Sequence, residues 1–347
     1  SCLPTESLNI QSRATVALTV ARDTASTHVD RSWDHQTPSM PLPTLAQPSA
    51  VGGSAGPSCP VHSTYVPSRL ETRWTQGIAL FASQDPQWTA GCAAARADED
   101  RIDEWLLFCN RRVAEPNALD VDQALLPDVL SHFKITPAAH GAPDCPTHTR
   151  YIPIEPLAVA LRHPKFPCWV PKPRVVNGRK HTNLRPLLFS TDWLVFVPPS
   201  LMGPPRRSYF FDLGSTYFDQ GVNGMADSLQ GFLHKYRLLS GVEFDEIFAW
   251  EAKALSHTDY WRRVDLNMSH KMHFYNTPVS PVLTSSMSAL RMIQTLAHPD
   301  DFVVFKLDID DTPTEVEMIL TILQTPSLIS LIDEVFWEHH VKGSPVQ

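Results

Sequence analysis

Acidic side chains follow three apolar stretches in the second half of the chain, and they are the residues best suited to chemistry. Asp212 and Gly214 close the first stretch, Glu251 follows the second, and Asp308 and Asp310 close the third. Carboxylates can accept hydrogen bonds from a sugar diol, take up a proton or bind a divalent cation. Any of these tasks requires a fold that gathers the acids in one place.

The apolar stretches that precede these acids have the character of strands buried on both faces. Tyr209–Gly214 carries three aromatic residues in succession, so its apolar residues do not alternate with polar ones. Ile247–Glu251 and Phe302–Asp310 repeat the pattern of an apolar run that ends in an acid, and Ile332–His340 is a fourth strand-like stretch. A glycine at position 214 permits the tight turn that must follow the first strand.

Segments with helical periodicity separate these strands. Asp227–Leu239, Ser286–Ala297 and the segment from Thr312 each place apolar residues on one side of a helix. Thr312 is expected to cap its helix, with Glu315 completing a capping box. With a further strand at 273–276, the order β-α-β-β-α-β-α-β predicts the α/β class, a mostly parallel sheet with helices on both faces. Ligands bind such sheets at the carboxyl ends of the strands, where the acids would lie.

The first half of the chain has a different organisation. Residues 1–70 are rich in Pro, Ser and Thr, which predicts an irregular extended arm that could bind a protein partner. Residues 71–184 are expected to form an accessory region, partly helical and partly irregular, whose clearest helix is the amphipathic stretch Asp98–Val113. The α/β domain is expected over residues 185–347, beginning with the strand-like stretch Trp193–Val197.

Composition narrows the classes of partner. The chain has 347 residues and a formal net charge of −8, which argues against nucleic acid as its main partner. The sequence contains no apolar run of about 18 residues, so we expect no transmembrane segment in it. Six cysteines, all in the first half, fit disulfides in a secretory or lumenal compartment, and scattered buried thiols are an equal alternative. No spacing of cysteine and histidine predicts a metal site.

The acid-ended strands, taken in order, resemble a known family. The series Phe211–Gly214, Ala249–Ala252, Phe305–Asp310 and Phe336–His340 is similar to the motifs of the FkbM-like methyltransferases. These are class I enzymes with a Rossmann-like core that use S-adenosylmethionine, and the resemblance covers about residues 205–342. One departure is that bulky Tyr217 and Phe218 stand where the family usually has further glycines.

The resemblance implies a cofactor site. Asp212, Gly214 and Ser215 would bind S-adenosylmethionine at the first motif, where the glycine turn lets the cofactor approach the backbone and the acid helps to place its amino-acid end. Glu251 would accept hydrogen bonds from both ribose hydroxyls, because a carboxylate offers two oxygens to two neighbouring donors. The methyl group would pass to an oxygen of a hydroxylated small-molecule or glycan acceptor.

The catalytic base and two rival functions stay open at the level of sequence. Asp308, Asp310 or His339 could take up the acceptor's proton. In a nucleotide-sugar glycosyltransferase, the pattern Asp308-Ile-Asp310 would instead hold a divalent cation on the diphosphate. A third hypothesis is a non-catalytic binding or assembly module with a methyltransferase-like fold.

Overall fold

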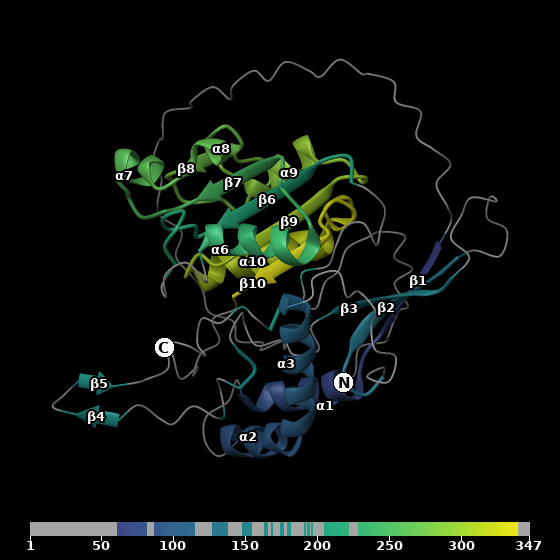
Figure 1. The fold of residues 1–347 in the computed structure, drawn as a ribbon. Coiled ribbons are helices and arrows are strands. Elements are labelled where there is room, and N and C mark those ends of the chain that lie inside the picture. Colours follow the sequence, from purple (N-terminus) through teal and green to yellow (C-terminus); the bar gives the residue numbers. More distant parts are fainter. Residues whose placement is uncertain are drawn as a thin grey trace.

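The computed structural model separates the chain into a mixed helix-and-strand part in the first half and a parallel α/β part in the second (Figure 1). The residues it describes are 61–81, 87–114, 127–137, 148–154, 163–165, 168, 174–176, 179–181, 191, 193–194, 196, 205–221 and 228–338. Most of the predicted N-terminal arm, as well as His339, lies outside these ranges. Among the described residues, no helix combines the length and the apolar character that a bilayer crossing requires.

A five-stranded parallel sheet forms the centre of the second half. Its strands run in the spatial order β10-β9-β6-β7-β8, and each neighbouring pair is parallel. The predicted mostly parallel α/β sheet is therefore confirmed. The chain places β7 and β8 on one side of β6, then returns to place β9 and β10 on the other. The strands are β6 (Ser208–Leu213), β7 (Glu246–Trp250), β8 (Met272–Tyr275), β9 (Phe302–Leu307) and β10 (Glu334–Trp337).

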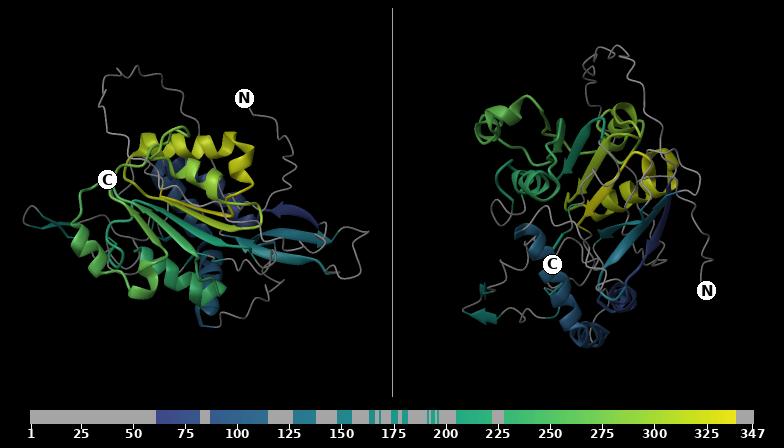
Figure 2. Two further views of the ribbon diagram at one scale, coloured as in Figure 1. Left: turned by 90° about the horizontal axis from the view of Figure 1, so that it is seen from above. Right: turned by 45° about the vertical axis from the view of Figure 1, so that its right-hand side comes forward.

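Helices cover both faces of this sheet, as Figure 2 shows for the green and yellow helices on its opposite sides. Helix α6 (Leu229–Lys235) continues into the π-helix η3 (Tyr236–Ser240), and both pack with Phe210 against one face. Phe211 lies on the opposite face, which α9, α10 and α11 cover. The three central strands β6, β7 and β9 are buried on both sides, which explains their unbroken apolar sequences. The bounds of these helices are α9 (Ala289–Leu296), α10 (Thr312–Gln324) and α11 (Pro326–Ile329).

Three details differ from the prediction. Two short helices, α7 (His257–Arg262) and α8 (Leu266–Ser269), lie between β7 and β8, where none was predicted. Helix α10 begins after Asp311, so Thr312 is its first residue rather than its cap. Glu315 forms no capping box there, because its carboxylate accepts hydrogen bonds from the Ile309 amide (3.1 Å) and the Trp337 indole (3.3 Å).

The first half contains more strand than the sequence predicted. Three helices, which include the predicted helix at 98–113, lie beside an antiparallel sheet of order β1-β2-β3, and β4 pairs with β5 as a separate two-stranded ribbon. The described part of Trp193–Val197 is not a strand, but Trp193 and Phe196 are buried in the core under α6. The elements are β1 (Val61–Val66), α1 (Arg69–Phe81), α2 (Gln87–Ala97), α3 (Glu99–Ala114), β2 (Ser131–Pro137), β3 (Arg150–Ile154), β4 (Arg174–Val176) and β5 (Arg179–His181).

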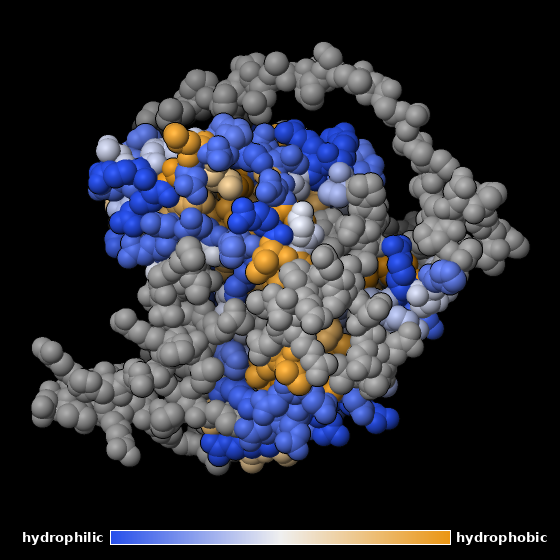
Figure 3. Space-filling view, viewed as in Figure 1, coloured by the Kyte–Doolittle hydropathy of each residue, from blue (hydrophilic) through white to orange (hydrophobic). Residues whose placement is uncertain are grey.

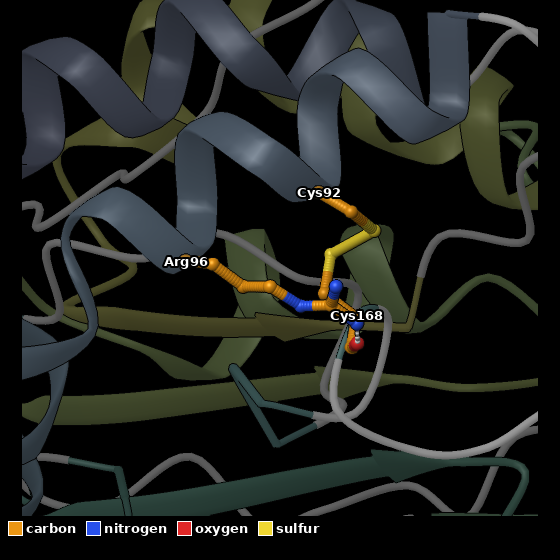
Figure 4. The surroundings of a disulfide bond; sticks show 3 residues. All are labelled: Cys92, Arg96 and Cys168. Atoms are coloured by element: carbon orange, nitrogen blue, oxygen red, sulfur yellow. Dashed lines mark hydrogen bonds between the residues drawn. A yellow bond between two sulfur atoms is a disulfide. The ribbon is translucent and has the colours of Figure 1, made fainter.

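Helix α3 joins the two halves, and a disulfide fastens α2 to a later segment. Leu106 packs against the hydrophobic clusters of both halves, and the Cys109 thiol donates a hydrogen bond to the Trp193 carbonyl (3.3 Å). Cys92 and Cys168 form a disulfide (Figure 4), and the neighbouring Arg96 side chain donates a hydrogen bond to the Cys168 carbonyl.

Apolar side chains on the described surface are dispersed. In the space-filling view, the described residues are largely hydrophilic with separate apolar spots (Figure 3). Leu107, Leu238, Leu266 and Val282 are the most exposed large apolar residues, and they come from four separate elements or loops. Single exposed apolar residues of this kind are normal on a protein surface.

Candidate functional site

The predicted acids gather around the carboxyl ends of β6, β7 and β9. This is the point where the strand order reverses, because β6 has the earlier strand β7 on one side and the later strand β9 on the other. Open parallel sheets bind ligands in the crevice at such a switch point. The strand register places Asp212 directly beside Lys306 on β9 and Ala249 on β7.

Asp212 lies inside the fold and not at the rim of the sheet. Its side chain is 1% exposed, and its Oδ1 accepts a hydrogen bond from the Lys306 ammonium at 2.9 Å. The alternation of a strand puts Asp212 on the same face as Phe210, beneath α6. Its second oxygen, Oδ2, is buried without a hydrogen-bond partner among the described residues. The acid therefore pairs first with the protein's own lysine.

Gly214 is required by a close approach of two chain segments. Its φ is +88°, and a Cβ at this position would lie 1.6 Å from the Asp308 carbonyl oxygen. The Asp308 amide in turn donates to the Leu213 carbonyl at 2.9 Å. The backbone after β9 thus occupies the space that the sequence assigned to an approaching cofactor.

The loop after β6 is held by β7. The amides of Gly214 and Ser215 both donate to the Trp250 carbonyl at 2.9 Å, and the Thr216 amide donates to Glu251 Oε2 at 3.0 Å. Thr216 has a φ of +48°, an uncommon conformation for a β-branched residue. Glu251 Oε1 accepts from the Lys253 amide at 2.7 Å. This partly exposed carboxylate keeps further lone pairs for a ligand.

Two buried hydroxyls lie beside this loop, one of them on a residue that the sequence did not point to. Ser215 Oγ and the Tyr260 hydroxyl have no hydrogen bond of acceptable geometry among the described residues. Burial raises the pKa of Tyr260; the Ser215 hydroxyl lowers it, and the Asp212 and Glu251 charges raise it. These four groups therefore share one electrostatic environment. Tyr260 lies on α7, and the only feature of the sequence that indicates this short helix is its capping residue Ser256.

Aromatic rings surround Tyr260. Its ring stacks on Phe274 with centroids 3.6 Å apart and on Tyr217 at 6.4 Å. The Arg263 guanidinium lies 4.5 Å above the Tyr217 ring. Phe218 is buried in the core under α6. Of the two bulky residues after the first motif, Tyr217 therefore packs against α7, and Phe218 is part of the core.

The candidate catalytic residues are only partly brought together. Asp308 Oδ2 lies 3.7 Å from the Lys306 ammonium, and its side chain is 28% exposed. Asp310 is exposed and has a φ of +56°. Within the described ranges, no group of three or more cysteine, histidine, aspartate or glutamate residues has the arrangement of a metal site. The structure gives Asp308 a partner, Lys306, that the sequence did not predict.

No protein-family model matches the chain, and neither does a curated protein or a solved structure.

Proposed function

We propose that residues 205–338 form a Rossmann-like domain that binds S-adenosylmethionine and transfers its methyl group to an oxygen of a hydroxylated acceptor, such as a small molecule or a glycan. The observation that carries this proposal is the position of Glu251. It follows β7, the strand next to β6, and its carboxylate reaches across to the loop after β6 at the point where the strand order reverses. An acid placed in this way suits the two hydroxyls of a ribose at a switch point.

The described residues fit the ribose end of the cofactor best. Glu251 is partly exposed, and each of its oxygens accepts one backbone amide, which leaves lone pairs for two hydroxyl donors. Gly214 has no room for a ligand at its Cβ position, because the Asp308 carbonyl fills it. Cofactor contacts would therefore come from Glu251 and the loop at 215–216, and Gly214 would serve to bring β6 and β9 together.

Asp308 is the acid best placed to receive a proton. When bound, the cofactor would supply an electrophilic methyl group. Asp308 is partly exposed next to the glycine turn, and its Oδ2 lies 3.7 Å from the Lys306 ammonium. A charged carboxylate can accept the proton of an acceptor hydroxyl as a general base. Lys306 and Asp212 would hold that carboxylate in position.

The disulfide bears on the compartment in which this function would operate. A bond between Cys92 and Cys168 persists in oxidising compartments and is rare in the cytosol. We therefore place the activity in the secretory pathway or another lumenal compartment, where glycans and other hydroxylated acceptors occur.

Calorimetric titration with S-adenosylmethionine and S-adenosylhomocysteine tests the proposal. The wild-type protein should bind both, and Glu251→Gln should weaken binding roughly tenfold or more, because a hydrogen bond to a charged group contributes about 1.5–3 kcal/mol. Glu317→Gln is the matched control, since this exposed glutamate is on α10, which packs on the other face of the sheet from α6. It should bind as the wild type does.

Two outcomes would overturn the proposal. If the wild-type protein binds neither compound, the methyltransferase hypothesis fails, and Mn²⁺ with nucleotide sugars becomes the next titration, directed at Asp308 and Asp310. If binding occurs but Glu251→Gln leaves it unchanged, the cofactor site lies elsewhere.

A further inference from the structure

The chain contains a single Asn-x-Ser/Thr triplet, which is Asn267-Met268-Ser269. In proteins that pass through the secretory pathway, such a triplet is the acceptor for an N-linked glycan when its middle residue is not proline. Triplets of this kind also occur by chance in proteins that are never glycosylated. The exposure of Asn267 and the compartment of the chain therefore decide whether this one can carry a glycan.

The structure places the triplet on the surface of the parallel α/β part. Its three residues belong to α8, a single helical turn between α7 and β8, and Asn267 is exposed. Met268 packs against the hydrophobic core under α6 and so holds the turn on the protein. Leu266, the residue before the triplet, is 88% exposed. A bulky, hydrated glycan can therefore extend from this turn into solvent without displacing the core.

The side chain of Asn267 has no structural task. Among the described residues, it has no hydrogen-bond partner. Asn276, which follows β8, is the other asparagine whose side chain the structure describes, and it belongs to no acceptor triplet. Its amide group donates to the carbonyls of Glu251 (2.8 Å) and Lys253 (2.7 Å) and accepts from the Leu255 amide (2.8 Å). Of these two asparagines, the one in the acceptor triplet is the one with a free amide.

A glycan on α8 would leave the candidate site clear. Helix α8 lies at the amino end of β7, because the Lys271 carbonyl just after it accepts from the Ile247 amide (2.8 Å) and the Lys271 ammonium donates to the Phe244 carbonyl (3.1 Å). Glu251 and the loop after β6 lie at the carboxyl ends of the strands. In a parallel sheet these are opposite edges. A glycan at Asn267 and a ligand beside Glu251 can therefore be present together.

The second requirement is an oxidising compartment. The disulfide between Cys92 and Cys168 indicates one, since such bonds form and persist in the secretory pathway and are rare in the cytosol. The disulfide lies in the first half of the chain and the triplet in the second, so the two observations are independent. Both are explained by a chain that passes through the compartment in which N-linked glycans are attached.

We propose that Asn267 is an N-glycosylation site. In this reaction, the side-chain amide nitrogen of Asn267 forms a bond to the anomeric carbon of the first sugar of a lipid diphosphate-linked oligosaccharide. The bond between that carbon and the diphosphate oxygen breaks, and the lipid diphosphate leaves with the electron pair. The amide nitrogen gives up one of its two protons. The cell's oligosaccharyltransferase catalyses the transfer and recognises the Ser269 hydroxyl as part of the triplet.

Peptide mapping of the full chain, isolated from the cells that make it, tests the proposal. A peptide N-glycosidase releases N-linked glycans and, in heavy-oxygen water, leaves a labelled aspartate in place of each glycosylated asparagine. We expect the label at position 267 and at no other asparagine, together with one shift in electrophoretic mobility. The peptide that contains Asn276 is the internal control and should stay unlabelled.

Variants expressed in the same cells separate the triplet from the structure of α8. Asn267→Gln removes the acceptor amide and Ser269→Ala removes the hydroxyl of the triplet, so each should abolish the mobility shift. The Ser269 hydroxyl also donates to the Leu266 carbonyl at 2.9 Å, so its loss could disturb the turn itself. Ser269→Thr keeps a hydroxyl and completes an acceptor triplet, and it should therefore retain the shift.

The outcomes distinguish this inference from the proposed function. An unmodified Asn267 in the isolated protein would overturn the inference, and so would an Asn267→Gln variant that keeps the mobility shift. The inference rests on the compartment and on the exposure of the triplet, and not on methyl transfer. A protein that carries the glycan but binds no S-adenosylmethionine would therefore refute the proposed function alone.

Discussion

The buried pair of Asp212 and Lys306 should be the most sensitive electrostatic contact in the parallel sheet. Their side chains are 1% and 5% exposed, and the charged atoms are 2.9 Å apart. At an effective dielectric constant of about 20, this distance corresponds to a Coulomb attraction of about 6 kcal/mol. The cost of removing both charges from water offsets much of it, so the pair as a whole contributes little.

Removal of one member has a much larger effect than the pair itself. Lys306→Met keeps the length of the side chain and deletes its charge, which leaves the Asp212 carboxylate buried without its cation. We expect the free energy of unfolding to fall by about 3–5 kcal/mol. The double variant Asp212→Asn, Lys306→Met removes both charges and should recover at least half of that loss.

Urea denaturation measures both effects. Unfolding would be followed by tryptophan fluorescence and circular dichroism, with agreement between the two transitions as the condition for extracting a free energy. Arg262→Met is the control, because its pair with Asp259 is 70% and 45% exposed and should be worth less than about 1 kcal/mol. A loss below about 1 kcal/mol for Lys306→Met, or a double variant less stable than the single one, would refute this reasoning.

Three further predictions follow from backbone geometry, titration and covalent structure. Gly214→Ala should lower the melting temperature far more than Gly241→Ala, since both glycines have positive φ but only at Gly214 does a Cβ meet another atom; equal shifts would contradict this. Because burial raises the pKa of Tyr260 in the folded protein, the contribution of its neutral form to stability is fully present below about pH 10 and is lost as the pH rises further. The melting temperature should therefore decline less steeply between about pH 8 and 11 in Tyr260→Phe than in the wild type. Identical slopes for the two proteins would rule this out. The cysteines of the Cys92–Cys168 disulfide are 76 positions apart, so its reduction should destabilise the first half by about 4 kcal/mol. Melting with and without reductant measures this loss. Reductant should have no effect on a variant in which both cysteines are replaced by serine.

The sheet could be predicted from sequence because its signals are local. Unbroken apolar runs such as Tyr209–Gly214 predict strands buried on both faces, and helical segments between them predict parallel connections. The helices α7 and α8 were missed because six and four residues are too few to show a periodic pattern. The antiparallel strands β2 and β3 were missed because prolines occur in or next to them, and prolines normally argue against a strand.

The site was predictable in location and less so in its contacts. Glu251 lies at the end of its strand beside the loop after β6, as the order of acids indicates. The burial of Asp212 follows from strand alternation, but its pairing with Lys306 depends on a register between β6 and β9 that no local pattern fixes. The tight turn predicted at Gly214 is present. The Asp308 carbonyl that leaves no room for a larger residue there lies 94 positions later, so the sequence around Gly214 gave no indication of this contact. Tyr260 reaches the site only through the packing of α7.

The distance along the chain between β6 and β9 also matters during synthesis. Asp212 and Lys306 are 94 positions apart, yet their strands are neighbours at the centre of the sheet. A ribosome that adds about 5–20 residues per second needs roughly 5–20 seconds to make the intervening chain. During that interval, the nascent protein holds an aromatic strand and an acid whose neighbour on one side, β9, has not yet been translated. Chaperone capture at this stage of elongation should therefore centre on residues 208–213.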